Sequence, residues 1–545
     1  MPEARTGPVH VIGASALGTL FEWYDFFLYG ALAGYIASHF FSGIDPSAAF
    51  ILALATFAVG FIVRPLGALV FGRIGDRVGR KNTFLVTLAI MGLATVLVGV
   101  LPGRAEIGVA APLLLVVLRI LQGLAIGGEF GGAIVFVAEH AGAGRRGLHT
   151  SWIPCMALGG LLLSLAVIAA VRSAMPSADF AEWGWRVPFL LSAVLLVISL
   201  WIRIRLQESP VFLRMKEEQV LSRSPLSEAF LHGPNARLML AALFGAVVGQ
   251  AVTFYTATFY AYYFLERVAR VDAATVTVLT GVAIAIGAPL VLACGWLSDR
   301  IGRKPPLLAG LGLAVLMYFP LFGALLDAAN PALAKARADA PVVLRANPAE
   351  CTLQFDPMGR RAFDDSSCDV ARSFLARAGI GYATFALASP SPARLDIGGV
   401  VMAAPDPAQL GADARTEAVA DFERRARAAL EATGHGQAAD SAAVDRPRVV
   451  ALLVALLLIT ALVTGPYSAL LAELFPARIR YTALSFPQNF GNGWFGGLLP
   501  AVAFTIVAAT GNVFAGLWYP VSLAALCFVV GALALPETCG RPMHE

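Results

Sequence analysis

Long apolar stretches alternate with short polar connections along most of the chain. A helix needs about 20 mostly apolar residues to cross a lipid bilayer, and twelve stretches reach that length. They cover approximately residues 11–38, 48–72, 82–101, 110–138, 149–171, 186–206, 237–265, 273–297, 305–326, 448–472, 483–509 and 513–535. The pattern therefore predicts an all-α polytopic membrane protein with twelve transmembrane helices.

Basic residues accumulate in the connections on one side of the expected helices. The connections that follow the even-numbered spans carry most of them, and the opposite connections carry few. The residues on the richer side include Arg73, Arg77, Arg80, Lys81, Arg145, Arg146, Arg203, Arg300, Arg303, Lys304, Arg478 and Arg480. Since basic loops stay in the cytoplasm, we expect both termini there and residues 327–447 on the other side.

One motif occurs in both halves of the chain. Its residues recur 223 positions later, so that Gly72, Asp76, Arg77, Gly79, Arg80 and Lys81 correspond to Gly295, Asp299, Arg300, Gly302, Arg303 and Lys304. A second pair, Ala138-Glu139 and Ala472-Glu473, is 334 positions apart, and 334 − 223 leaves 111 additional residues between spans 9 and 10. The repeat predicts a six-helix unit that is used twice, with an insertion in the second copy.

The insertion, residues 327–447, is polar and has periodicities of its own. The alternation in RLDIGGVVM (394–402) indicates strands and ARTEAVADFERRARAALEAT (414–433) indicates a helix, so we expect a small α+β module. Cys351 and Cys368 lie together in this segment, and outside the cytoplasm they can be oxidised. We expect a disulfide bond between them; the alternative is two free thiols in a flexible linker.

The amino-acid composition agrees with a lipid environment and argues against some classes of binding partner. Hydrophobic residues make up 58% of the chain and charged residues 14%, and the mean hydropathy is +0.73. The net charge is only +4 and the basic residues are dispersed, which argues against nucleic acid as a partner. The insertion shows no metal-ligand cluster and no nucleophile motif. We expect a protein that is not an enzyme and that has no cofactor.

The repeated loop GRIGDRVGRK (72–81) places a carboxylate near a helix end, with basic residues directly after it. A carboxylate is stabilised at the positive end of a neighbouring helix, so such a loop can clamp two helices together and hold one state of a gate. The expected gating residues are Asp76, Arg77 and Arg80 in the first half and Asp299, Arg300 and Arg303 in the second. The alternative is that these charges only fix the topology.

These paired loops resemble the signature of the major facilitator superfamily. Within it, FEWYDFFLYG (21–30) and RILQGLAIGGEFGGA (119–133) resemble the metabolite:proton symporter family, whose members import dicarboxylates, citrate, shikimate, proline or betaine. The resemblance implies two six-helix bundles that alternate access to a central site. The implied parts are an amino-terminal bundle (1–206), a cytoplasmic linker (207–236), a carboxy-terminal bundle in two parts (237–326 and 448–545, the latter including a cytoplasmic tail) and a periplasmic insertion (327–447).

The first span carries the candidate proton-coupling groups. Glu22, Asp25 and Tyr29 are spaced by three and four residues and therefore share one helix face. Ionisable side chains at membrane depth are costly and usually face a cavity or a partner, where a carboxyl group can take up and release a proton. The alternative for each acid is a permanently paired structural charge or a place in a wide aqueous vestibule.

Two arginines, Arg64 and Arg119, lie well inside spans 2 and 4. They stay charged at any accessible pH, so they either neutralise the acids of spans 1 and 4 or bind a substrate carboxylate. We favour Arg119, which Gln122 follows at helical spacing, for substrate binding or for coupling. Arg64 and Glu129 are expected to be structural.

Polar side chains of the second half supply the other wall of the expected site. Gln250 and Tyr255 belong to the run GQAVTFYTATFYAYYF in span 7, and Asn489 lies among glycines in span 11. We expect these three side chains, together with Tyr29, Arg119 and Gln122, to bind substrate. For the aromatic run, the alternative is an ordinary core or an interfacial belt.

Together these features predict proton-coupled import of a small metabolite, with an organic acid anion as the first expectation. Pro154 in WIPCMALGG lacks the preceding glycine of the motif that antiporters of the superfamily carry, which favours symport. One alternative is a zwitterionic osmolyte such as proline or betaine, and another is a membrane-anchored receptor or enzyme that acts through the insertion. We expect a monomer in the lipid bilayer of a bacterial inner membrane, with no metal, that binds its small-molecule substrate and protons.

Overall fold

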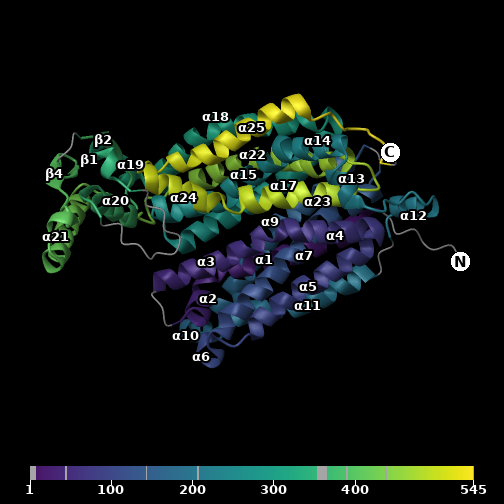
Figure 1. Ribbon diagram of the computed structural model, residues 1–545, viewed down its shortest axis with the longest axis horizontal. Helices are drawn as coiled ribbons and strands as arrows, with labels where there is room; N and C mark the ends of the chain where they lie inside the picture. Colours follow the sequence, from purple (N-terminus) through teal and green to yellow (C-terminus); the bar gives the residue numbers. More distant parts are fainter. Residues whose placement is uncertain are drawn as a thin grey trace.

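Two bundles of long helices lie side by side, and a small module of strands and helices projects from one end (Figure 1). The computed structural model describes residues 8–42, 46–142, 144–204, 208–352, 365–387, 391–435 and 438–543. Within these residues eleven helices are long and apolar enough to cross a membrane. Helix α1 (Pro8–Ala31) packs inside the first bundle as the twelfth. The predicted all-α architecture of twelve spanning helices is therefore confirmed.

The first bundle contains the helices of the amino-terminal half. Its long helices are α1, α3 (Pro46–Ile62), α4 (Arg64–Arg77), α5 (Arg80–Val100), α7 (Ala110–His140), α9 (Trp152–Ser173) and α11 (Val187–Ile204), and its short ones are α2 (Ala33–Phe40), α6 (Arg104–Ile107), α8 (Arg146–Thr150) and α10 (Ser177–Glu182). The second span is interrupted at Val63, because Pro65 in the first turn of α4 has no N–H group to continue the helix. The interruption lies directly before Arg64.

The second bundle repeats this arrangement with the carboxy-terminal half. Its helices are α14 (Gly233–Ala242), α15 (Val248–Tyr255), α16 (Ala261–Tyr263), α17 (Ala273–Ile301), α18 (Lys304–Ala329), α22 (Arg446–Leu474), α23 (Arg480–Phe490), α24 (Leu499–Thr510) and α25 (Trp518–Ala534). Helices α12 (Pro210–Glu217) and α13 (Pro225–Phe230) belong to the linker between the bundles.

Two spans of the second bundle contain π-helical stretches. The span from α14 to α16 is π-helical at Leu243–Val247, Thr256–Tyr260 and Phe264–Val268. Helix α23 continues into a π-helical stretch at Gly491–Gly496. Such stretches are rare and frequently occur at functional sites. Both spans carry residues of the expected substrate wall.

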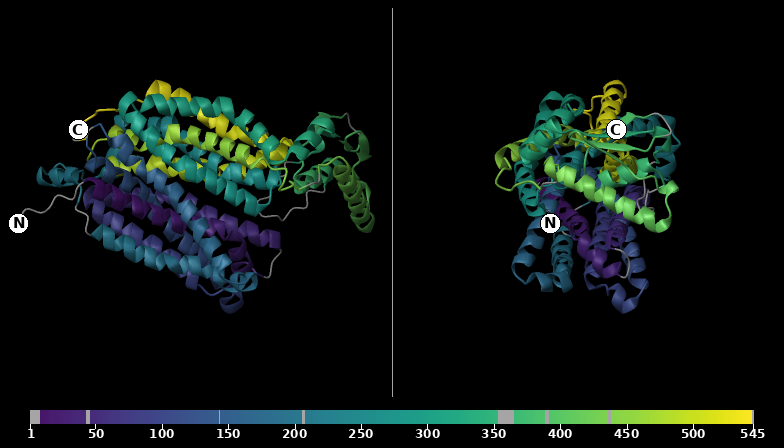
Figure 2. Two further views of the ribbon diagram at one scale, coloured as in Figure 1. Left: turned by 180° about the vertical axis from the view of Figure 1, so that it is seen from behind. Right: turned by 90° about the vertical axis from the view of Figure 1, so that its left-hand side faces the viewer.

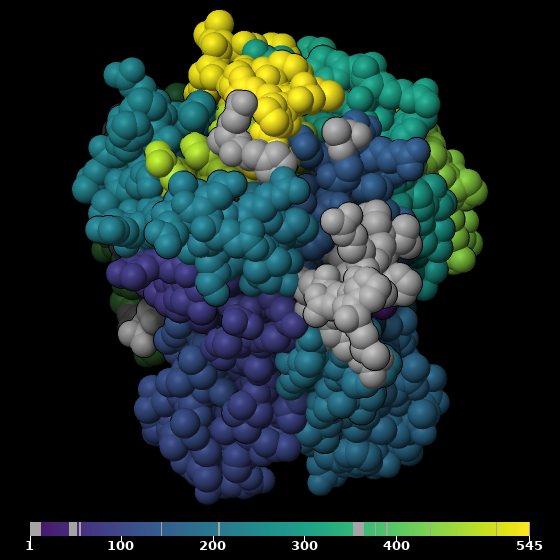
Figure 3. All heavy atoms as spheres, turned by 90° about the vertical axis from the view of Figure 1, so that its right-hand side faces the viewer, coloured from purple at the N-terminus to yellow at the C-terminus, as the bar shows by residue number. Residues whose placement is uncertain are grey.

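The two ends of the bundles differ. Both termini and the linker lie at one end and the inserted module lies at the other, as the views from behind and from the side also show (Figures 1 and 2). We call these the terminal end and the insertion end. Figure 3 looks onto the terminal end, where atoms of the linker lie over the boundary between the bundles.

The inserted module is an α+β unit, as the sequence predicts. Its four strands pair in the order β2-β1-β3-β4. Strand β1 (Val342–Ala346) is parallel to β2 (Ala383–Ala386) and antiparallel to β3 (Arg394–Ile397), which forms a hairpin with β4 (Val400–Ala403). The hairpin turn needs positive φ angles, which Gly398 and Gly399 supply at 56° and 91°.

Helices and a disulfide bond complete the module. The helices are α19 (Pro331–Asp339), α20 (Ser367–Ala378) and α21 (Ala412–Ala432). Leu344, Phe374 and Phe422 are buried between the sheet and the helices. A disulfide bond joins Cys351 to Cys368 at the start of α20, with the two Cα atoms 5.3 Å apart. The module thus has a core of its own.

Backbone hydrogen bonds attach the module to the second bundle. The Tyr382 N–H donates to the carbonyl of Gly511 at 2.7 Å, in the connection between α24 and α25. The Ala439 N–H donates to the carbonyl of Arg270 at 3.1 Å, in the connection before α17. The module therefore lies on two connections at the insertion end.

Candidate functional site

At the terminal end, Asp76 joins the two bundles. Its carboxylate accepts hydrogen bonds from the N–H (2.9 Å) and hydroxyl (2.7 Å) of Thr482 and from the N–H of Tyr481 (3.3 Å). Both residues lie in the first turn of α23. Arg80 lies 3.3 Å from the same carboxylate. The buried carboxylate thus satisfies N–H groups that a helix leaves free at its amino terminus.

Asp299, the counterpart of Asp76, joins the bundles in the same way. Its carboxylate accepts hydrogen bonds from the N–H groups of Gly147 (2.8 Å) and Leu148 (2.9 Å) in the first turn of α8. Arg303 donates to it at 2.7 Å. The two copies of the sequence motif therefore form two equivalent contacts, which we call the carboxylate clamps.

Each carboxylate clamp has a buried ion pair beside it that also joins the bundles. Arg480 donates to Glu139 at 3.1 Å, and Arg146 lies 3.3 Å from Glu473. Between the bundle helices that the structure describes, the hydrogen bonds and ion pairs lie at this end or at middle depth. The terminal end is therefore closed.

Two arginines of the repeated motif take no part in the clamps. Arg80 and Arg303 are buried beside the carboxylates, whereas Arg77 and Arg300 are exposed. Arg300 lies over the ring of Trp296, 3.9 Å from its centroid. The geometry of a clamp thus involves one aspartate and the arginine four residues after it.

Halfway along α1, two buried acids face the interior. Glu22 is 1% exposed, and within the described residues neither of its carboxylate oxygens has a hydrogen-bond partner. Asp25 is 5% exposed and accepts a hydrogen bond from the Ser192 hydroxyl of α11 at 2.5 Å. A buried carboxylate without a partner is costly. Glu22 therefore needs a proton or a mobile partner in this state.

Glu129 has a partner that the sequence did not single out. Arg203 of α11 donates to Glu129 at 2.5 Å, and both side chains are buried. Arg203 crosses Gly18 of α1, where a Cβ atom would lie 1.8 Å from the guanidinium. From the sequence, Arg203 counts only as a cytoplasmic charge, because its pairing depends on helix packing. Glu129 is thus neutralised by Arg203 rather than by Arg64 or Arg119.

Arg119 lies inside the first bundle against aromatic rings. Its guanidinium carbon is 4.2 Å from the ring centroid of Tyr29 and 5.2 Å from that of Phe26. Its Nη1 donates to Gln122 at 2.5 Å, and Gln122 donates to the Thr95 hydroxyl at 2.8 Å. Two of its nitrogens, Nε and Nη2, have no hydrogen-bond partner in the described part of the chain. The structure thus brings Arg119, Gln122 and Tyr29 together within one bundle.

Arg64, in contrast, reaches the second bundle. Its Nε donates to the side-chain oxygen of Asn489 in α23 at 3.1 Å. The amide nitrogen of Asn489 donates to the carbonyl of Gly127 in α7 at 2.7 Å. The guanidinium carbon lies 5.7 Å from the ring centroid of Trp23. Asn489 therefore bridges the bundles, and Arg64 lies at the boundary between them.

Polar side chains of the second bundle face this boundary. Tyr255 and Tyr467 are buried, and both lie near Arg64. Gln250 accepts a hydrogen bond from the amide nitrogen of Asn492 at 3.1 Å. Tyr467 was not among the residues expected from the sequence, because one tyrosine in a long apolar helix produces no periodic signal.

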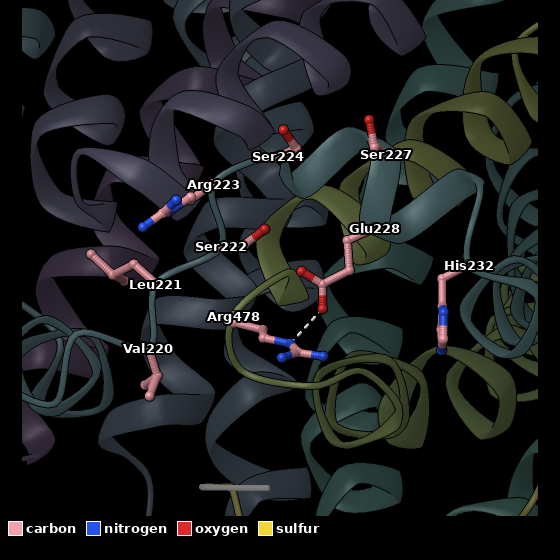
Figure 4. Close-up of a pocket in the computed structure, with 9 residues that line it drawn as sticks. All are labelled: Val220, Leu221, Ser222, Arg223, Ser224, Ser227, Glu228, His232 and Arg478. Carbon is pink, nitrogen blue, oxygen red and sulfur yellow. Dashed lines mark ion pairs between the residues drawn. The ribbon is translucent and has the colours of Figure 1, made fainter.

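A cavity at the terminal end lies apart from these residues. It has a volume of about 500 Å³ and is lined by residues 220–224 of the linker with Ser227, Glu228, His232 and Arg478. Figure 4 shows the ion pair between Arg478 and Glu228 that crosses it. Its position on the linker separates it from the groups around Glu22 and Arg64. No cluster of three metal-ligating side chains occurs among the residues that the structure describes.

Comparisons with known proteins agree with this architecture. The family model described as Major Facilitator Superfamily matches residues 15–334. The shikimate transporter of Escherichia coli (strain K12) is 37% identical over 317 residues, which are 57% of this chain and 71% of that protein. The proline/betaine transporter of Salmonella typhimurium (strain LT2) is 36% identical over 319 residues, which are 57% of this chain and 63% of that protein.

The solved structures support the same fold. The proton:xylose symporter XylE of E. coli aligns with a TM-score of 0.64 and 17% identity, over 99% of this chain and 98% of that one. The similarity to these transporters, together with two linked six-helix bundles, defines a secondary transporter. The chain belongs to the major facilitator superfamily and, within it, to the metabolite:proton symporters. The resemblance seen in the sequence is confirmed, and it indicates a multi-pass membrane transporter.

Proposed function

We propose that the protein imports a small organic anion together with protons and that Glu22 carries the proton. The observation that supports this most directly is the buried Glu22 carboxyl group, which has no hydrogen-bond partner in the described residues. A carboxyl group without a fixed cation can hold a proton in the closed state and release it when water reaches it. Asp25, which already accepts a hydrogen bond from the Ser192 hydroxyl, is the alternative carrier of the proton.

The balance of buried charge supports an anionic substrate. Arg203 is paired with Glu129, whereas Arg64 and Arg119 have no carboxylate within ion-pair distance in the described part of the chain. When the acids of α1 are protonated, the interior carries uncompensated positive charge, which attracts an anion. The similarity to a shikimate transporter agrees with a carboxylate as substrate.

A zwitterion such as proline or betaine is the second candidate. The similarity to a proline/betaine transporter supports it, and so does the gathering of aromatic rings at the boundary. The ring centroids of Phe61 and Tyr255 lie 6.0 Å apart, and those of Phe27 and Phe259 lie 5.6 Å apart. Aromatic faces attract quaternary ammonium groups. The carboxylate of a zwitterion would use the same arginines.

The residues inside one bundle and those at the boundary have different proposed roles. Arg119, with Gln122 and Tyr29, contacts only the first bundle, so we assign this group to coupling between proton and substrate. Gln250, Tyr255 and Asn489 face the boundary, where a substrate touches both bundles. The carboxylate clamps of Asp76 and Asp299 hold the gate at the terminal end.

We assign the terminal end to the cytoplasm of a bacterial inner membrane and the insertion to the outside. Basic residues gather at the terminal end, as the positive-inside rule requires. With that end closed, the structure corresponds to a state shut toward the cytoplasm. One chain supplies both bundles and both walls of the site, so a monomer embedded in lipid suffices for transport.

Uptake into proteoliposomes tests the proposed function. Purified protein should accumulate one carboxylate from a panel of labelled shikimate, citrate, proline and glycine betaine when an inward proton gradient is imposed. A protonophore should abolish the accumulation, because the gradient drives it. Absence of accumulation for the whole panel, or accumulation that is indifferent to the gradient, would contradict the proposal.

A further inference from the structure

We propose that the carboxylate of the substrate binds Arg64 between Tyr255 and Tyr467, and that Glu22 competes with it for this positive charge. The inference rests on the proposed function and locates its binding site. It also gives Arg64 a different role from the structural one that its place in the second span suggests.

Buried polar atoms without partners gather around Arg64. Within the described residues, Nη1 of Arg64 and both oxygens of Glu22 have no hydrogen-bond partner, and the hydroxyls of Tyr255 and Tyr467 make no well-aligned hydrogen bond although Tyr255 lies close to Arg64 and Tyr467 close to Asn492. Buried polar groups are nearly always hydrogen-bonded in native proteins, so this group has capacity left to bind a polar ligand. The guanidinium and the two phenols are donors, and a carboxylate offers two oxygens that accept several hydrogen bonds. The ligand that fits this group thus has the chemistry of a carboxylate.

The guanidinium is held ready for such a ligand. Its Nε is bonded to Asn489, and its carbon lies 5.7 Å and 5.9 Å from the ring centroids of Trp23 and Phe61. These contacts orient the group while Nη1 stays free. A carboxylate there touches both bundles, whereas a ligand on Arg119 would touch one. Only contacts that differ between conformations can couple binding to movement.

The helices of the second bundle are irregular where they face Arg64. Tyr255 directly precedes the π-helical stretch Thr256–Tyr260, and Gly491–Gly496 follows shortly after Asn489. Tyr467 follows Pro466 inside α22. Proline and π-helical turns are places where a helix bends or changes its hydrogen bonding. The wall opposite Arg64 can therefore adjust to a bound solute.

The charges around Glu22 explain the competition. The groups that act on it are Asp25 on its own helix, Glu129 of α7, Arg203 of α11 and Arg64 of α4. An ionised Glu22 is attracted by Arg203, which is also paired with Glu129, and by Arg64, which has no carboxylate partner of its own in the described residues. When Glu22 is protonated, the positive charge of Arg64 is free to bind the substrate carboxylate. When Glu22 loses its proton, its negative charge competes with the substrate for Arg64. Proton and anion therefore favour each other's binding, as symport requires.

The affinity of purified full-length variants tests the site. The probe is the compound among shikimate, citrate, proline and glycine betaine that the wild type accumulates, since each carries a carboxylate. Arg64→Gln should raise Kd on the order of 100-fold, and Arg64→Lys should raise it less because the charge remains. Tyr255→Phe and Tyr467→Phe should each raise Kd several-fold. Tyr318→Phe is the matched control, because its buried hydroxyl also lacks a partner among the described residues, while its ring packs edge-on against Phe322 inside the second bundle.

Two further variants separate binding from packing and from coupling. Asn489→Ala removes the bond from Arg64 to the second bundle but keeps the guanidinium, so its effect on Kd should be much smaller than that of Arg64→Gln. In the wild type, Kd should rise as the pH is raised and Glu22 ionises and competes. In Glu22→Gln, Kd should not change with pH, because the competitor is gone.

The results of these experiments distinguish a failure of the proposed Arg64 site from a failure of the proposed transport function. If the wild type accumulates none of the four probes, the proposed function is wrong and the site with it. If it accumulates one and Arg64→Gln leaves Kd unchanged, the site is wrong and the function stands. A pH dependence of Kd that persists in Glu22→Gln would contradict the competition. Loss of affinity in the Arg64 and tyrosine variants, with Tyr318→Phe unchanged, supports the site.

Discussion

Single carboxylates close the terminal end by satisfying helix amino termini of the opposite bundle. Asp76 accepts hydrogen bonds from Tyr481 and Thr482, and Asp299 accepts them from Gly147 and Leu148. These bonds must break when the bundles part at this end. We therefore propose that each aspartate stabilises one conformation without contact with the substrate.

Replacement of Asp76 by asparagine should change conformation and turnover rather than affinity. The loss of charge and of one acceptor should destabilise the closed state by about 1–2 kcal/mol, a five- to thirtyfold shift in the equilibrium at about this energy. Turnover in proteoliposomes should fall while Kd stays nearly constant. Asp272→Asn is the control, because Asp272 bonds the Thr275 N–H at 2.8 Å within one bundle. A large loss of affinity at unchanged turnover would refute the clamp.

The residues that could be predicted are those with a periodic or repeated signal. Asp76 and Asp299 are visible because the same spacing occurs twice. The pairing of Arg203 with Glu129 gives no such signal, since the two lie on different helices and meet only through packing. Tyr467 was missed for the same reason. Sequence patterns thus indicate which residues are functional candidates more readily than which of these residues contact one another in the folded protein.

The inserted module is an added element with its own covalent closure. Cys351 and Cys368 are 17 positions apart, and closing such a loop is worth about 3 kcal/mol in the loop-entropy model. Protein purified from membranes should contain this bond. Replacing both cysteines by alanine should make the module sensitive to limited proteolysis and leave the bundles intact. Non-reducing mass spectrometry of peptides measures the first outcome directly.

Alkylation of thiols from either side of the membrane, read out by the same mass spectrometry, tests the orientation. Cys539, a free thiol at the terminal end, is the internal control and should be alkylated from the cytoplasmic side. Free alkylation of both Cys351 and Cys368 would contradict the disulfide bond. Their labelling from the cytoplasmic side would contradict the topology itself.

The module should also lose stability at acid pH through His435. Burial lowers the pKa of His435, whose Nε2 lies 2.7 Å from the Ala340 carbonyl. The unfolded module therefore binds a proton more readily than the folded one. Stability is complete above the ordinary histidine pKa of about 6.5 and falls as the pH drops from there toward the lowered folded-state value. Hydrogen-exchange protection factors of the module, which correct for the base-catalysed intrinsic exchange rate, should be lower at about pH 5.5 than at about pH 7.5, and His435→Gln should reduce the difference. Equal protection factors at both pH values in the wild type would exclude this effect.

At the level of elements, the sequence predicts where helices run better than how they are interrupted. Twelve spans and an α+β insertion follow from apolar length and from alternation. The π-helical stretches Thr256–Tyr260 and Gly491–Gly496 could not be predicted, because a π turn depends on neighbouring helices rather than on local composition. These irregular stretches lie beside the proposed carboxylate site.

The whole molecule consists of two equivalent bundles, and the proposed substrate site lies at the boundary between them. The 223-residue offset between the motifs predicts the repeat, and the structure shows the two clamps that it produces. The contacts at the boundary could not be predicted from the sequence, since Arg64 and Asn489, which form a hydrogen bond there, are 425 positions apart. We propose that, at this boundary, a buried acid on α1 couples the proton gradient to movement of the substrate.

Gradient-driven accumulation by Glu22→Gln protein in proteoliposomes, with Asp25→Asn beside it, tests that claim most directly. We predict that the Glu22→Gln protein no longer accumulates substrate under an inward proton gradient but still exchanges it between vesicles and medium, because exchange needs no net proton movement. Arg478→Gln, which removes the ion pair to Glu228 in the linker, should accumulate normally and serves as the control. Full accumulation in both acid variants would contradict the account.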